Sequence, residues 1–317
     1  MKSGKTRSSI SLGSALQRTS RPTLDLESKE KRWAVHAAMD DSWACSAAYI
    51  YALHLNPSGR AWEYLRRNPR YQRDWARHRR GRSQRIAARW GLATLVDPRF
   101  DARQVVPVWT IDAPWPVTLV RDEMTFAEPA LDGIGCFSLW GLRGRKSMVG
   151  EERGIRLVVD SPALAAQVRL GSGLCDGDQF AYQVPAAAND RAAWAMLTEF
   201  RALSAASRVG NAPPPERPGI GDLSHARALQ VLDGLAAGAS HRTLAQGIFG
   251  TVAVTRGWQP DGALRAQIRY LVRKSRALME GEYRSLASAL GRPSIAFERT
   301  SMVACRQRRH RSSSHTR

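Results

Sequence analysis

The chain has 317 residues, and its 48 Lys and Arg against 28 Asp and Glu give a formal charge of +20. Hydrophobic residues make up 43% of the chain and include ten Trp, which excludes a wholly disordered protein. No apolar run approaches the roughly 20 residues of a membrane span, so no membrane partner is expected. An excess of positive charge on this scale favours a polyanionic partner.

The charge is concentrated in two regions. Residues 60–103 hold 13 basic and 4 acidic residues, and residues 265–317 hold 13 basic and 3 acidic ones. Residues 104–222 hold 11 basic and 14 acidic residues. Most of the basic residues are Arg, whose planar fork suits phosphate and guanine edges. A GC-rich genome would explain the preference for Arg over Lys, but it would not explain the net charge.

The cysteines give no sign of a metal site. Cys45, Cys136, Cys175 and Cys305 are scattered, and no two of them lie at metal-ligand spacing. We therefore expect reduced thiols. Residues 1–22 lack the apolar core of a secretory signal, so the sequence predicts a cytoplasmic protein, associated with the nucleoid.

The N-terminal part of the chain is predicted to be mainly helical. Residues 1–32 are rich in Ser, Lys and Arg without a sustained period, and we expect a disordered basic arm. Residues 33–121 should form the first ordered region. Its hydrophobic pattern and its Pro and Gly positions predict helices and then two strands, at 43–55, 60–67, 71–90, 105–111 and 117–121.

The middle region, residues 122–210, has mixed α and β character. Residues 155–160 (IRLVVD) predict a strand. Ser161-Pro162 resembles a helix start, and residues 190–206 predict an amphipathic helix. The chain is therefore expected to be α+β, with a helical N-terminal region, a small mixed β-containing middle and an all-α C-terminal domain.

A proline-rich linker, residues 211–221, should separate the middle region from a C-terminal unit, residues 222–291. The three helices predicted in that unit share an apolar face, so we expect it to fold alone and proteolysis to cut in the linker. Residues 292–317 turn polar and should form a disordered basic tail.

The C-terminal unit begins with two helices joined by a short turn. Residues 223–237 place leucines on one face, and Gly238 suits the C-terminal cap. Ser240 is placed to cap a second helix, which ends at Gly250. The turn between them is about as short as a helix-turn-helix requires. Residues 251–260 are expected to form a loop.

The third helix, residues 261–279, has an apolar face and an arginine face. At about 100° per residue, four arginines share a sector of about 80° beside the apolar face: Arg265, Arg269, Arg273 and Arg276. No Asp or Glu lies between residues 262 and 279. Such a helix can lie in a major groove. The alternative is a solvated charged face, which would ordinarily carry i,i+4 Glu–Arg pairs.

These two helices supply the predicted DNA-binding residues. Arg265 and Arg269, in the first half of the third helix, are the candidates for guanine contacts. The free backbone N–H groups at the start of the second helix favour phosphate. The further predicted DNA-binding residues are Ser240, His241 and Arg242 at that start, and Arg273, Lys274 and Arg276 further along the third helix.

The segment AWEYLRRNPRYQRDW interleaves aromatic residues with arginines. Such interleaving can stack on single-stranded nucleic acid. The aromatics can also belong to the core, and we favour the core because nine of the ten Trp precede residue 200.

Catalysis finds little support in the sequence. There is no glycine-rich phosphate loop followed by Lys and Ser or Thr. No His has Arg three positions later, as a tyrosine recombinase would need, and no His pairs with a carboxylate at metal-ligand spacing. We therefore predict no catalytic residues, no metal, no cofactor and no enzyme activity.

Two stretches carry a family resemblance. SHARALQVLDGLAAGASHRTLAQGIFG, followed by LRAQIRYLVRKSRALMEGEYRSLA, resembles the helix-turn-helix-variant DNA-binding domain of RovC-like transcription factors. The region AAYIYALHLNPSGRAWEYLRRNPRYQRDW, continuing to residue 112, resembles the transcriptional regulator-like domain of FseA-like proteobacterial activators. Residues 1–32 and 292–317 lie outside both matches.

The resemblance implies a sequence-specific, DNA-binding transcriptional regulator, an activator of mobile-element transfer and excision or of secretion genes. Double-stranded DNA is the expected partner, and RNA polymerase, a regulatory antiactivator protein and a second copy of the chain are further candidates. Two alternatives stay open at this point. One is an accessory protein for mobile-element replication or partition, and the other is an antiactivator-like interaction module that does not bind DNA.

Overall fold

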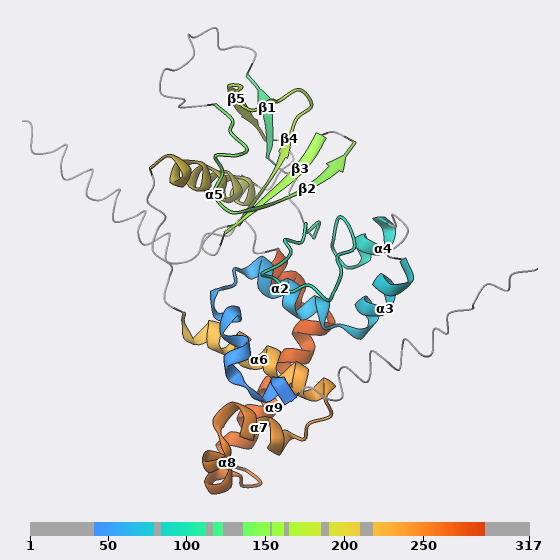
Figure 1. The fold of residues 1–317 in the computed structure, drawn as a ribbon, viewed down its shortest axis with the longest axis vertical. Coiled ribbons are helices and arrows are strands. Elements are labelled where there is room, and N and C mark those ends of the chain that lie inside the picture. Colours follow the sequence, from blue (N-terminus) through green and yellow to red (C-terminus); the bar gives the residue numbers. More distant parts are fainter. Residues whose placement is uncertain are drawn as a thin grey trace, which may run out of the picture. The chain divides into compact units, whose positions relative to one another are not determined.

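The computed structural model describes residues 41–78, 84–111, 117–122, 136–152, 154–161, 165–184, 190–209 and 218–288 (Figure 1). The predicted basic arm, the predicted basic tail and residues 211–217 of the predicted linker lie outside these ranges. None of the helices in them combines the length and the apolar character that crossing a membrane would require.

The N-terminal ordered part is helical, as predicted. It contains the 3-10 helices η1 (Asp41–Ala44) and η2 (Ser46–His54) and the α-helices α2 (Pro57–Arg66), α3 (Pro69–His78) and α4 (Gln84–Arg89). Asn56 caps α2 by accepting a hydrogen bond from the Gly59 amide at 2.9 Å. In place of the predicted helix 43–55 there are two 3-10 helices with Cys45 between them. The predicted helix 71–90 is helical in α3 and α4, and residues 79–83 lie outside the described residues.

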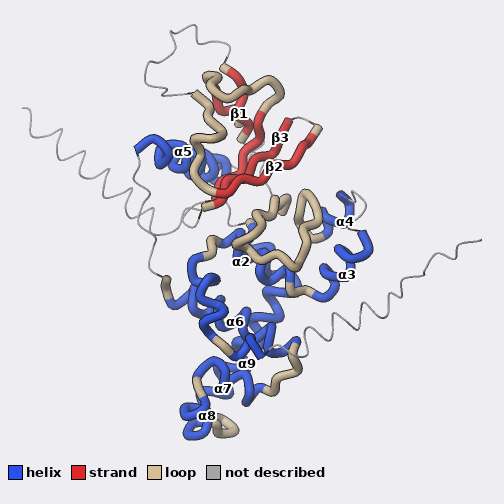
Figure 2. The backbone as a smooth tube through the Cα atoms, in the orientation of Figure 1, coloured by secondary structure: helices blue, strands red, loops and turns tan. Residues whose placement is uncertain are grey.

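Five strands form one sheet, in the order β2-β3-β4-β1-β5. They are β1 (Thr118–Arg121), β2 (Arg145–Glu151), β3 (Gly154–Asp160), β4 (Ala165–Leu170) and β5 (Phe180–Gln183). Only β1 and β4 pair in parallel, and the other neighbours are antiparallel. The helix α5 (Asp190–Val209) packs against β4, and its Phe200 and Leu203 complete a core with the sheet (Figure 2).

Two sequence predictions in this part are wrong. Residues 105–111 form no strand, although Trp109 makes an isolated bridge to Leu92. The Trp109 side chain is buried in the core, and its Nε1 donates a hydrogen bond to Ser58 Oγ at 3.0 Å. Ser161-Pro162 does not start a helix running into residues 165–170, because these residues form β4 and pair with β3 over their whole length.

The C-terminal part is all-α. It contains α6 (Ile220–Ala236), α7 (His241–Phe249), α8 (Thr251–Gly257) and α9 (Ala263–Ala277). A π-helical stretch, η3 (Leu278–Glu282), leads into α10 (Tyr283–Ala287). The predicted α+β class is confirmed. The predicted loop at 251–260 is wrong, because α8 occupies most of it and buries Val254.

The two ends of the described chain share a core. One hydrophobic cluster joins Trp62, Tyr64 and Leu65 of α2 to Leu229 of α6 and Tyr283 of α10. A second cluster surrounds Trp43 of η1 with side chains of α6, α7, α8 and α9. The helical N-terminal part therefore packs directly on the C-terminal helices.

Trp43 lies against Gly234 of α6 and Gly247 of α7. A Cβ added at Gly234 would overlap Leu244 and lie 2.8 Å from Trp43 Cε3, and one added at Gly247 would lie 3.1 Å from Trp43 Cζ3. Ser46 Oγ also bonds Gln230 Oε1 at 3.2 Å and the Gly247 carbonyl at 3.3 Å. A segment near residue 45 is thus built into the C-terminal helical unit.

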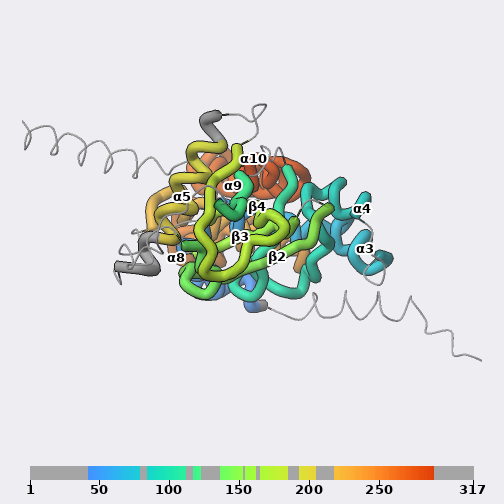
Figure 3. Tube along the Cα trace, turned by 90° about the horizontal axis from the view of Figure 1, so that it is seen from above, coloured from blue at the N-terminus to red at the C-terminus, as the bar shows by residue number. Residues whose placement is uncertain are grey.

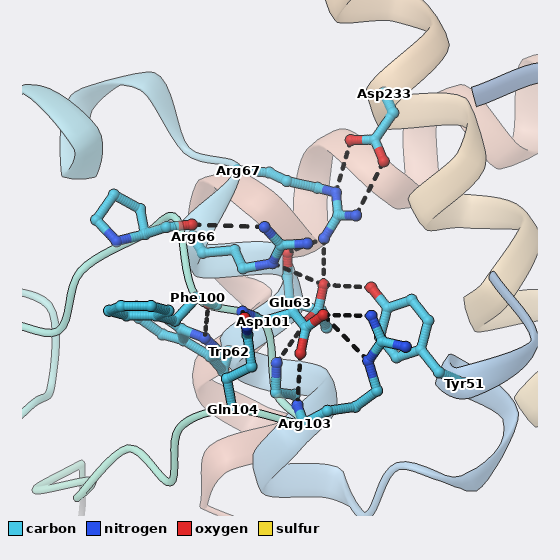
Figure 4. Close-up of polar contacts among 12 residues, drawn as sticks. Tyr51, Trp62, Glu63, Arg66, Arg67, Phe100, Asp101, Arg103, Gln104 and Asp233 are labelled. Atoms are coloured by element: carbon cyan, nitrogen blue, oxygen red, sulfur yellow. Dashed lines mark hydrogen bonds and ion pairs between the residues drawn. The ribbon is translucent and has the colours of Figure 1, made fainter. Parts of the chain in front are cut away.

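A buried ionic network joins α2 to α6 (Figure 4). Glu63 is fully buried and accepts hydrogen bonds from Tyr51 at 2.7 Å and Arg66 at 2.8 Å, and it pairs with Arg67. Arg67 reaches across to Asp233 of α6. Burial alone would raise the pKa of Glu63, but Arg67 and Arg66 lower it to about 2. Glu63 is therefore ionised inside this core.

Candidate nucleic-acid interface

The aromatic residues of α2 and α3 belong to the core and are not a stacking surface. Trp62, Tyr64 and Tyr71 are fully buried, and Trp75 is 9% exposed. Trp62 and Tyr71 meet edge to face with ring centroids 5.7 Å apart. The preferred prediction for these residues is confirmed, and they cannot stack on the bases of a single strand.

The start of α7 is built as the sequence predicts. Gly238 takes a positive φ of 79° after α6, which favours glycine. Ser240 then caps α7, and its hydroxyl accepts a hydrogen bond from the Thr243 amide at 3.1 Å. Leu244 and Ala245 turn inward, and His241 and Arg242 are exposed on the first turn. The first amides of α7 thus point to solvent beside two basic side chains.

The helix α9 has the two faces predicted for it. Ile268, Leu271, Val272 and Ser275 are buried. Arg269, Arg273 and Arg276 are exposed, and in the described part of the chain none of these three forms an ion pair. Three uncompensated charges on one face repel each other unless an anion lies against them.

An open groove of about 500 Å³ brings the two helices together. His241 from α7 lines it with Arg269, Arg273 and Arg276 from α9. Val272 and Ala277 are its apolar lining residues, and Glu280 contributes the one carboxylate of the lining. The lining of the groove is therefore mostly basic, with one carboxylate supplied by η3.

Two of the predicted contact residues have other partners. Lys274 Nζ lies 3.0 Å from Ser224 Oγ of α6 and is only partly exposed. The Arg265 guanidinium lies 5.8 Å from the centre of the Trp258 ring. Lys274 and Arg265 are not among the residues that line the groove. Ser240 serves as the cap of α7, and Arg242 is exposed outside the groove lining.

The helix α8 occupies a segment that the sequence predicts to be a loop. Thr251, Val252, Thr255 and Arg256 are exposed on it. Its sequence, TVAVTRG, is rich in β-branched residues, which have a low helix propensity. In the structure Val254 is its buried residue. The burial of that one side chain against α7 and α9 is a tertiary effect that no local pattern reports.

A cluster of helices with an uncompensated basic groove is typical of DNA-binding domains. A family model described as the type VI secretion (T6SS) transcription factor DNA-binding domain, RovC, matches residues 183–288. A second model, the proteobacterial transcriptional regulator-like domain, matches residues 42–93. The two matched domains follow the order that the sequence resemblance predicts, and they indicate a DNA-binding transcriptional regulator. No curated protein matches it.

The matched ranges can be placed on the fold. The range 42–93 covers the segment from η1 to the end of α4. The range 183–288 begins before α5 and so includes α5 as well as α6 to α10. Both ranges contribute to the core that joins α2 to α6, so the two matched domains are in direct contact.

Proposed function

We propose that the chain is a sequence-specific regulator of transcription that binds duplex DNA through the groove between α7 and α9. Arg269, Arg273 and Arg276 contact the duplex from α9, and His241 and the free amides of α7 bind a phosphate beside them. Arg242 and Ser240 at the start of α7, and Arg265 and Lys274 at the edges of α9, are secondary contacts. The observation that supports this proposal is the convergence of His241 and three unpaired arginines on one groove.

The proposal extends to the genes under control. The family resemblance favours an activator of mobile-element transfer and excision or of secretion genes, with RNA polymerase or a regulatory antiactivator as protein partners. An accessory role in replication or partition of a mobile element would use the same groove. The position of the bound sites separates these two functions, because a regulator binds upstream of promoters. Mapping bound sites by chromatin immunoprecipitation decides between them.

A non-DNA-binding interaction module is the weaker candidate. It would leave three exposed arginines of one groove without an anionic partner, at a cost in self-repulsion. Among the described residues, no group of three His, Cys, Asp or Glu side chains could hold a metal ion. We assign the chain a regulatory and not a catalytic role on the strength of the groove and the matched domains.

The test is the salt dependence of binding to duplex DNA. The logarithm of the binding constant should fall with the logarithm of salt concentration by about 0.9 per neutralised phosphate, so several contacts give a steep slope. The variant R269Q/R273Q/R276Q should flatten that slope by about 2–3. A wild-type slope near zero, or a variant that keeps the wild-type slope, would exclude the groove as the DNA site.

A further inference from the structure

A second set of arginines lies outside the groove, on α3 and α4. Arg70, Arg73 and Arg77 follow one another at intervals of three and four residues along α3, so they share one side of that helix. Arg85 lies on α4, and all four side chains are exposed. We call these four residues the α3–α4 arginine surface.

These arginines are uncompensated because the local carboxylates are already engaged. The segment 60–103 holds four acidic residues, and each pairs with another arginine. The pairs are Glu63 with Arg66 and Arg67, Asp74 with Arg89, Asp97 with Arg99, and Asp101 with Arg103. Over the described ranges, no carboxylate lies within ion-pair distance of a member of the α3–α4 arginine surface. Arg73 Nε donates a hydrogen bond to the Pro69 carbonyl at 3.3 Å.

The surface is held firmly to the C-terminal helices. Asp74 of α3 accepts a hydrogen bond from Trp90 Nε1 at 3.0 Å, which fixes α3 against the end of α4. Tyr283 of α10 donates to the Trp90 carbonyl at 3.1 Å, and Arg284 donates to the Arg89 carbonyl. Since α10 follows α9 through η3, the α3–α4 arginine surface is tied to the helix that lines the groove. The helices α3 and α4 lie side by side in both views (Figures 1 and 3).

The chemistry of the surface fits a phosphate backbone. Exposed residues among the arginines of α3 are Gln72 and Ala76, and the aromatic residues Tyr71 and Trp75 are turned inward. A protein partner would ordinarily find apolar or aromatic anchors at the centre of an interface. A single strand would need exposed rings on which to stack. A duplex needs only charge and Arg forks.

We propose that the α3–α4 arginine surface is a second phosphate-binding surface, which contacts the duplex beside the segment held by the α7–α9 groove. This rests on the proposed function, because the DNA is the same molecule. The second surface adds affinity for any sequence and lengthens the footprint, and it does not read bases. The regulator-like domain thereby contributes directly to DNA binding.

The experiment uses the full chain and a duplex of arbitrary sequence, about 40 bp long, or roughly four helical turns. Fluorescence anisotropy across salt concentrations gives the log–log slope for each variant. R70Q/R73Q/R77Q should flatten the slope by about 2–3, at about 0.9 per lost phosphate contact, and the corresponding lysine variant should restore most of it. R99Q/R103Q/R121Q removes the same charge from arginines that already pair with carboxylates, and it should keep the wild-type slope.

The outcomes separate this proposal from the one on which it rests. If R269Q/R273Q/R276Q flattens the slope but R70Q/R73Q/R77Q matches the charge control, the second surface is overturned and the groove stands. If the α3 variant alone flattens the slope, the groove assignment fails. The single variants Arg70→Gln and Arg77→Gln change exposed positions, and each should reduce the steepness of the log–log slope by about 0.9. They test the proposal independently of the triple variant, in case that variant misfolds.

Discussion

Arg67 and Asp233 form a two-pronged ion pair across 166 residues of sequence. Arg67 Nε lies 2.7 Å from Asp233 Oδ1, and Arg67 Nη2 lies 2.9 Å from Oδ2. Tyr49 also donates to Asp233 Oδ2, at 2.8 Å. Burial would raise the pKa of Asp233, but Arg67 lowers it below its usual value, so the pair is charged on both sides. This pair fixes α6, the first helix of the C-terminal unit, against α2.

Replacement of Asp233 by Asn should destabilise the fold. It leaves the Arg67 guanidinium without its main partner, and a hydrogen bond to a charged group contributes about 1.5–3 kcal/mol. We expect a loss of about 2 kcal/mol in the free energy of unfolding by urea. The control Arg121→Ala breaks a surface pair at 3.8 Å and should cost less than about 1 kcal/mol. Equal losses in the two variants would show that the Arg67–Asp233 pair is not a structural joint.

Trp43→Ala should weaken the C-terminal helical unit from outside it. Trp43 is 7% exposed and fills the space beside Gly234 and Gly247. Removing a buried Trp side chain costs about 3–5 kcal/mol. The control is Trp140→Ala, since Trp140 is 80% exposed and its removal should change stability little. A Trp43 variant as stable as the Trp140 variant would contradict the shared core.

Contacts from the N-terminal helices oppose the release of residues 222–291 as a separate unit. Sequence patterning predicts that this unit folds alone and that proteolysis cuts in the linker 211–221. Trp43 and Arg67 contribute to its packing, so we expect the C-terminal piece to stay bound to the rest of the chain after such a cut. Size-exclusion chromatography of the nicked protein should show one peak. Separate elution of a folded C-terminal piece would support independent folding.

His225 makes stability depend on pH. It lies on α6, where Tyr64 Oη contacts its Nδ1 at 2.9 Å. Burial, with the positive charges of Arg60 and Lys274, lowers its pKa to about 4. The unfolded chain takes up a proton near pH 6.5, whereas the folded chain does not until about pH 4. Stability from this residue is therefore complete above pH 6.5 and declines below it, by up to about 1.4 kcal/mol per pH unit.

Unfolding by urea at pH 7 and at pH 5 tests this dependence. The wild-type chain should lose stability between these two values, and His225→Gln should lose less because it has no proton to bind. His241→Gln, at an exposed position, should keep the wild-type dependence. Parallel pH profiles for all three proteins would rule out His225 as the source.

The sequence predicted the elements whose signals are local. The Ser240 cap of α7 and the apolar and arginine faces of α9 are signals that lie within a few turns, and they are present in the structure. The strand β3 (GIRLVVD) is rich in branched apolar residues and agrees with the predicted strand, but β2 (RKSMVGE) has no apolar alternation and the sequence does not predict it. It is a strand because all seven of its residues pair with β3, which is information held by another segment.

The candidate site could be predicted only in part for the same reason. The arginines of α9 follow from helical spacing, but their convergence with His241 depends on how α7 packs on α9. Helical spacing also places Lys274 and Arg265 near the arginine face of α9. In the structure Lys274 hydrogen-bonds Ser224, and the Arg265 guanidinium lies over the Trp258 ring. Arg67 pairs with Asp233, and the four carboxylates of residues 60–103 pair with arginines outside the α3–α4 arginine surface. These contacts depend on tertiary packing, which the sequence alone does not predict.

Glu280 should limit the affinity of the groove for DNA. It is exposed and lines the groove, where its charge opposes a phosphate. Glu280→Gln should tighten binding to arbitrary duplex DNA by about threefold, which corresponds to less than about 1 kcal/mol, as expected for an exposed charge. Glu282→Gln removes the same charge from an exposed residue outside the groove lining and should have a smaller effect. Equal effects in the two variants would indicate only a change in net charge.

The last prediction separates base contacts from phosphate contacts. Arg269 is the one candidate guanine contact that lines the groove, whereas Arg242 lies at the start of α7, where phosphate is favoured. Removing an Arg–guanine pair costs roughly 1–3 kcal/mol and relaxes preference at one base position, but removing a phosphate contact weakens binding to all sequences alike. Arg269→Ala should therefore reduce binding to a mapped operator far more than binding to a scrambled duplex.

Arg242→Ala should reduce binding to both duplexes by the same factor, and it is the matched control because it removes one exposed arginine from the neighbouring helix. Titration of each variant on the two duplexes at one salt concentration gives the comparison. If Arg269→Ala lowers both affinities equally, α9 only clamps the backbone. The exposed residues Thr251, Thr255 and Arg256 of α8 then become the candidates for base contact, and Arg256→Ala should relax specificity in place of Arg269→Ala.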